Sequence, residues 1–218
     1  VAKLLENRPF TVSAHMTSSY NYETLITVDL LKASKIIRIK DFALQILKAY
    51  GYNYSKINYH NKEFIRITNK ENAQSFYISF VENIMTVSFN KQLIKHTIDQ
   101  IDEKSLLNNS NFEEVKKSTS SWSLFRFFFN YNKLEDFIRV YQNPANYNSL
   151  IKGFRNASFS GFDMNISEDG FSLEGQTRLT KSASDLMKEL NQINASKPEA
   201  FRILPKNTAV YLSFAFQD

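Results

Sequence analysis

Four short segments between residues 54 and 89 constrain the fold of this chain more than any other part of its sequence. The segments are 54–60, 63–69, 74–81 and 84–89. Each alternates apolar and polar residues, and in the third Phe76, Ile78 and Phe80 share one face while Tyr77 and Val81 share the other. Polar turns of two to four residues separate them. This spacing predicts an antiparallel meander.

The rest of the chain contains segments with strand periodicity and segments with helical periodicity. Strand alternation recurs at 10–17, 22–31, 121–131, 154–166, 170–179 and 208–216. Helical spacing recurs at 40–50, 91–101, 112–117, 132–141 and 182–193. Interleaved helices and antiparallel strands predict an α+β fold. A weak internal repeat of strand, Asn-containing turn and helix links 84–98 with 123–138, and a third such unit is expected to begin at 202–218.

The stretch SWSLFRFFFNY (121–131) is the most aromatic part of the chain. Strand periodicity places Phe125, Phe127 and Phe129 on one face, and Arg126 and Phe128 on the other. A strand that is apolar on both sides is typical of the covered interior of a sheet, so we expect this strand to be buried core. The alternative is an aromatic platform that binds a sugar, a base or a lipid.

Composition narrows the classes of function. The chain has 218 residues, of which 43% are hydrophobic, which suits a folded globular protein with a sizeable core. The formal charge of +5 is spread along the chain rather than gathered in one stripe, which disfavours nucleic acid as a partner. The absence of cysteine excludes disulfides and thiolate chemistry. No stretch is apolar enough to predict a membrane span.

The sequence contains no recognisable motif for catalysis. The glycines form neither a dinucleotide fingerprint nor a phosphate-cradling loop, so no cofactor is expected. His15, His60 and His96 lie far apart in sequence and lack metal-ligand spacing, so we expect each at a strand or helix surface. The carboxylate pairs Glu135-Asp136 and Glu168-Asp169 are typical of a solvated helix face and of a turn. We therefore expect no catalytic residues, although carboxylates from separate strands are not excluded.

The densest group of cations is Lys32, Lys35, Arg38 and Lys40. Isoleucines alternate with Arg38 and Lys40, which predicts a solvated edge strand that its charges protect from aggregation. The alternative interpretation is contact with anionic lipid headgroups or another polyanion. The candidate contact residues are therefore these four cations together with Phe125, Phe127 and Phe129.

Several segments resemble an uncharacterised family of exported bacterial proteins, known as domain of unknown function 3352. The resemblance is carried by a Leu-Pro-x-x-Thr strand opening at Leu204, by Asp163 within a strand, and by Leu173-Glu174-Gly175 at the end of the next strand. It implies a location in the cell envelope or periplasm, with an anchoring segment upstream of Val1. It implies no activity and assigns no functional residues. We expect residues 1–218 to form one α+β module of a longer exported protein.

Three functions are compatible with these observations. The sequence favours a non-enzymatic cell-envelope module that binds or scaffolds a partner such as an envelope protein, a glycan or an anionic lipid. The first alternative is a hydrolase acting on glycan or lipid through carboxylates from separate strands. The second is a carrier of lipid or another hydrophobic ligand that uses Phe125, Phe127 and Phe129.

Overall fold

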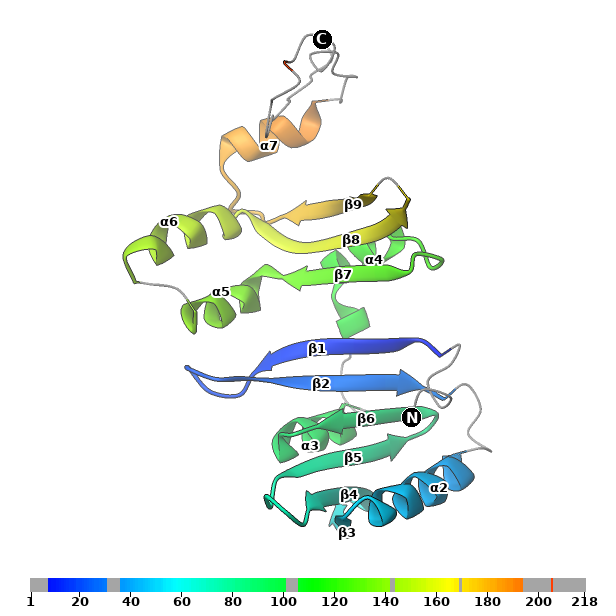
Figure 1. The fold of residues 1–218 in the computed structure, drawn as a ribbon. Helices are drawn as coiled ribbons and strands as arrows, with labels where there is room; N and C mark the ends of the chain where they lie inside the picture. The colour runs from blue at the N-terminus through cyan, green and yellow to red at the C-terminus, as the bar shows by residue number, and fades with distance from the viewer. Residues whose placement is uncertain are drawn as a thin grey trace. The chain divides into compact units, whose positions relative to one another are not determined.

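The computed structural model describes residues 8–30, 36–100, 106–141, 144–168, 170–193 and 205. Two antiparallel sheets alternate along the chain with helices, which confirms the α+β class (Figure 1). The chain divides into two compact units. The first contains residues Val1–Glu113 and Lys133–Tyr147, and the second contains Glu114–Asn132 and Asn148–Asp218. The prediction of one module over residues 1–218 stays a prediction.

The first unit contains a six-stranded antiparallel sheet with the order β1-β2-β6-β5-β4-β3. Its strands are β1 (Phe10–Met16), β2 (Tyr22–Asp29), β3 (Tyr52–Tyr59), β4 (Lys62–Asn69), β5 (Ser75–Val81) and β6 (Ile84–Ser88). The last four are the expected meander, because each pairs with the next in antiparallel register. β2 pairs with β6, so the amino-terminal hairpin extends the meander at its last strand.

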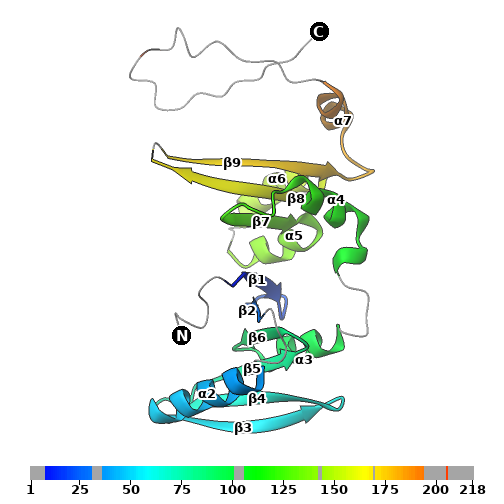
Figure 2. The same cartoon turned by 90° about the vertical axis from the view of Figure 1, so that its right-hand side faces the viewer.

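Helices cover both faces of this sheet. Leu44 and Leu47 of α2 (Ile36–Ala49) pack on one face against residues that include Ile65. Ile94 and Ile98 of α3 (Lys91–Asp99) pack on the other face. Figure 2 shows the two helices on opposite sides of the strands. The alternation predicted for 74–81 is confirmed, because its side chains divide between these two cores.

The second unit contains a three-stranded antiparallel sheet with the order β7-β8-β9. The strands are β7 (Phe125–Asn130), β8 (Ala157–Ser167) and β9 (Gly170–Leu179). β8 and β9 form the predicted hairpin, and the register of β7 ends at Met164, so the hairpin tip projects past β7 (Figure 2). The remaining described elements of the chain lie in either unit or cross the boundary between the two. They are η2 (Leu106–Asn108), α4 (Ser110–Ser118), α5 (Tyr131–Arg139), α6 (Pro144–Phe154) and α7 (Asp185–Gln192).

The strand-helix repeat is present in the backbone. β6 leads into α3 and β7 leads into α5, and in both cases an asparagine precedes the helix. The Asn90 side chain accepts hydrogen bonds from the backbone amides of Gln92 and Leu93 and so caps α3. The expected strand over 208–216, and with it the start of a further unit, lies outside the described residues.

One local prediction is wrong, and one helix was not predicted. The alternating stretch around Arg38 and Lys40 is not an edge strand, because α2 already begins at Ile36. A run in which apolar and basic residues alternate also suits a helix whose long cationic side chains reach solvent. The helix α6 was not predicted, because Pro144 suggested the end of a helix, whereas it occupies the first position of a new one.

Candidate functional site

The aromatic strand β7 lies at the edge of its sheet, not in a core. Within the described residues it pairs with β8 alone. Phe125 is 44% exposed, and Phe127 and Phe129 are each 40% exposed. The prediction of a buried strand covered on both faces is therefore wrong. Periodicity assigned the side chains to faces correctly, but it does not tell which of those faces another element covers.

The first face of this sheet packs on α4. A Cβ added at Gly161 of β8 would lie 2.9 Å from the carbonyl oxygen of Val115 and 3.1 Å from the Thr119 methyl, so the helix meets the strand at the glycine itself. Phe128 of β7 pairs with Gly161 and shares this face. Val115 is fully buried there. We call this side the α4 face.

The second face carries no charge, and apart from Ser160 and Thr177 at its base it is apolar. Alternation places every charged residue of the three strands, namely Arg126, Asp163, Glu174 and Arg178, on the α4 face. The cross-strand rows of the second face join Phe125 with Met164 and Leu173, and Phe127 with Phe162. We call this surface the aromatic face, and it consists of Phe125, Phe127, Phe129, Phe162, Met164, Ile166, Phe171 and Leu173.

Exposure increases along the aromatic face towards the hairpin tip. Ile166, Phe171 and Leu173 near the tip are 60%, 68% and 53% exposed. Trp122, which precedes β7 at the same end of the register, is 94% exposed. Large apolar side chains gathered on one exposed surface are typical of an interaction site, whereas an ordinary protein surface has only scattered ones.

The opposite end of the aromatic face is closed by polar contacts. The Tyr131 hydroxyl lies 2.9 Å from the Ser160 hydroxyl, which is 2.6 Å from that of Thr177. Ser160 is completely buried, and the Tyr131 ring packs on Phe154 with centroids 5.5 Å apart. These contacts fix β8 against the start of α5. The end of the aromatic face opposite the hairpin tip is therefore packed, and the part towards the tip is the most exposed.

Asp163, singled out by the family resemblance, has a positioning role. It is buried, and its Oδ2 accepts a hydrogen bond of 2.8 Å from the Ser120 backbone amide. The Ser120 hydroxyl in turn accepts a hydrogen bond from the Trp122 amide. The Asp163 carboxylate therefore fixes the segment that contains Trp122 and leads into β7.

The cationic part of the candidate site belongs to the first unit, whereas the aromatic face belongs to the second. Lys32 and Lys35 lie outside the described residues. Arg38 and Lys40 belong to α2 of the first unit, and the structure describes their backbone. Contact of these four residues with a polyanion stays a prediction.

A polar cluster that the sequence did not reveal surrounds the turn between β3 and β4. The Tyr59 hydroxyl donates to Asp99 Oδ2 at 3.1 Å, and His60 Nδ1 lies 3.0 Å from Asp99 Oδ1. The His60 ring stacks on Tyr59, and Lys95 Nζ lies 4.7 Å from the Tyr59 centroid. Partial desolvation, followed by the hydrogen bond and charge of Asp99, raises the pKa of Tyr59. The side chains flank an open hollow lined by Asn58–Glu63.

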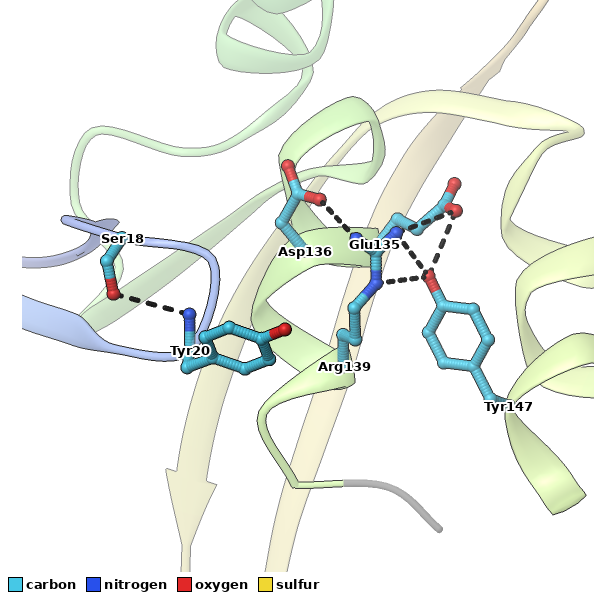
Figure 3. Close-up of polar contacts among 6 residues, drawn as sticks. All are labelled: Ser18, Tyr20, Glu135, Asp136, Arg139 and Tyr147. Atoms are coloured by element: carbon cyan, nitrogen blue, oxygen red, sulfur yellow. Dashed lines mark hydrogen bonds and ion pairs between the residues drawn. The ribbon is translucent and has the colours of Figure 1, made fainter. Parts of the chain in front are cut away.

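Polar contacts also join α5 with α6 and close the turn after β1. In Figure 3, Arg139 of α5 reaches Tyr147 of α6, with Nη2 donating to the hydroxyl at 3.0 Å. That hydroxyl donates to Glu135, and Asp136 lies 3.7 Å from Arg139 Nη1. The carboxylates expected on a solvated helix face therefore share one guanidinium. In the turn after β1, the Tyr20 amide donates to the Ser18 hydroxyl.

Among the described side chains, no group of three or more His, Asp or Glu is arranged to hold a metal ion. None of the helices that the structure describes has the length and apolar character needed to cross a bilayer.

Comparison with known proteins gives no match. No family model, no curated protein and no solved structure is significantly similar to the chain.

Proposed function

We propose that the protein is a non-enzymatic cell-envelope module that binds a protein partner through the aromatic face. The observation that carries the proposal is the exposure of an uncharged apolar surface on the second unit. Aromatic anchors such as Phe125 and Phe171 supply much of the binding energy at protein interfaces. The envelope location rests on the sequence resemblance.

The shape of the surface favours a protein over a small ligand. A sheet face contacts a lipid chain from one side, whereas a carrier encloses most of its ligand in a cavity. The exposed areas of Phe125, Phe127, Phe129, Ile166, Phe171 and Leu173 together amount to about 600 Å², if each fully exposed side chain presents about 150–250 Å². That area approaches the roughly 800 Å² that each partner contributes to a standard protein interface.

Site-specific photo-crosslinking tests this proposal in the native host. A benzophenone amino acid replaces Phe127 in one variant and Tyr54 in the control. Tyr54 lies on β3 and is 46% exposed, close to the exposure of Phe127. We expect a discrete protein adduct from position 127 that Phe125→Ser and Phe129→Ser suppress, and no such adduct from position 54.

The adduct identifies the partner, and a binding measurement completes the test. Purified partner should bind the wild-type protein, and Phe127→Ser should weaken that binding about 10- to 30-fold, as expected for an aromatic anchor. Equal adducts from positions 127 and 54, or unchanged affinity of Phe127→Ser, would contradict the proposal. A lipid that co-purifies with the wild type in native mass spectrometry, and is lost in Phe127→Ser, would favour the carrier instead.

One observation favours a hydrolase, but through a histidine and a helix carboxylate rather than the carboxylates from separate strands that the sequence suggested. Asp99 holds Nδ1 of His60, and the His60 side chain is 70% exposed. This arrangement orients an imidazole for proton transfer through its other nitrogen. A panel of glycan and ester substrates tests it: hydrolysis that His60→Ala and Asp99→Asn both abolish would support the alternative, and hydrolysis unaffected by them would not.

A further inference from the structure

We infer that the occupant of the aromatic face is a second copy of this chain, with the two faces packed against each other around a two-fold axis. The inference rests on the proposed function, because it uses the same surface and names its partner. Two sheets that pack face to face interdigitate their side chains at a spacing of about 10 Å. The α4 face of this sheet is already covered by a helix, so the aromatic face is the one left for a partner.

Charge is the first argument for a second copy. A two-fold interface places each surface patch against itself, so any net charge in the patch meets its own sign. The aromatic face has no charged residue in its three strands, since Arg126, Glu174 and Arg178 point to the α4 face. It therefore meets its own copy without burying a like-charge pair, which would destabilise the contact.

Area is the second argument. Two faces of about 600 Å² each bury about 1,200 Å² in total, which is the lower end of the range for specific protein interfaces. Interfaces at the low end of this range are typically weak and transient, so we expect a dimer with a Kd on the order of micromolar. In such a dimer the partner copy covers Phe171 and Leu173 near the tip, which are exposed to water in the monomer.

Sedimentation velocity over about 1–100 μM protein tests the inference, since that range brackets a micromolar Kd. We expect the wild type to shift from monomer to dimer with concentration. Leu173→Glu should weaken the dimer at least about 100-fold, because it buries an unpaired carboxylate in each copy. Phe171→Glu serves as a second variant at a still more exposed position. The matched control is Tyr54→Glu, which should dimerise like the wild type.

Each outcome is decisive. Dimerisation that Leu173→Glu and Phe171→Glu remove and Tyr54→Glu keeps supports the inference, provided that circular dichroism shows equal folding. A wild type that is monomeric throughout overturns it, and so does a dimer that survives both glutamate variants. A monomer whose position 127 crosslinks to a different protein leaves the proposed function intact and overturns the second copy alone. A monomer without a specific adduct overturns both.

Discussion

Gly161→Ala tests whether α4 rests directly on the backbone of β8. The added Cβ would lie 2.9 Å from the Val115 carbonyl oxygen and 3.1 Å from both the Phe128 ring and the Thr119 methyl. Because the carbonyl belongs to the helix backbone, α4 must move, and overpacking of this kind costs about 1–3 kcal/mol. Alanine restricts the unfolded chain and returns about 0.4–1 kcal/mol. We expect the free energy of unfolding to fall by about 1–2 kcal/mol.

Gly153→Ala is the matched control, because it is the same substitution in the same unit with open space around it. Nothing lies within 4 Å of a Cβ at Gly153. The residue belongs to α6, where alanine is favoured over glycine by about 0.5–1 kcal/mol. The two variants should therefore change stability in opposite directions.

Urea unfolding measures both variants. Far-ultraviolet circular dichroism follows the whole chain, and fluorescence of Trp122, the single tryptophan, follows the second unit. The midpoint should fall for Gly161→Ala and rise for Gly153→Ala, with unchanged denaturant slopes. If Gly161→Ala is as stable as the wild type, or both variants shift in the same direction, α4 does not pack on the glycine as described.

Three further predictions concern the first unit. Asn90→Ala removes the cap of α3 and should lower the free energy of unfolding by about 1 kcal/mol in urea titrations, whereas Asn90→Asp should keep most of it. Spectrophotometric titration should show Tyr59 among the tyrosines that ionise above the usual range, because desolvation and then Asp99 raise its pKa; Asp99→Asn should lower the pKa of that tyrosine, and an unchanged titration would refute the assignment. Partial desolvation and then the charge of His96 lower the pKa of the exposed His15 below 6.5. Its contribution to stability is therefore present above pH 6.5 and is lost as the pH falls through the lowered pKa, and His15→Gln should flatten the measured pH dependence in that range.

Local pattern was sufficient to predict most elements of this fold. The meander, the β8–β9 hairpin and α3 follow from periodicity and turn residues that lie next to each other in the chain. The start of α2 did not, because the alternation around Arg38 suits an edge strand as well as a helix. The helix α6 was missed because a proline both ends helices and begins them.

The candidate site depended on contacts that no local pattern contains. Phe125, Phe127 and Phe129 share a face as predicted, but their exposure follows from which element covers that face. His60 and Asp99 are 39 residues apart in sequence, and they meet because the β3–β4 turn reaches the end of α3. The signal that pointed to the surface was the aromatic density itself, and the error was to equate that density with burial.

The order of strands in the first sheet has a consequence for synthesis. β1 and β2 leave the ribosome first, but the inner neighbour of β2 is β6, the last strand of the sheet. Pairing between distant segments is slow, because a long loop must close before the contact is gained. We expect the four-stranded meander to fold as soon as β6 emerges. The amino-terminal hairpin then joins a finished template, so truncation before Ile84 should leave a nascent chain that requires chaperone protection.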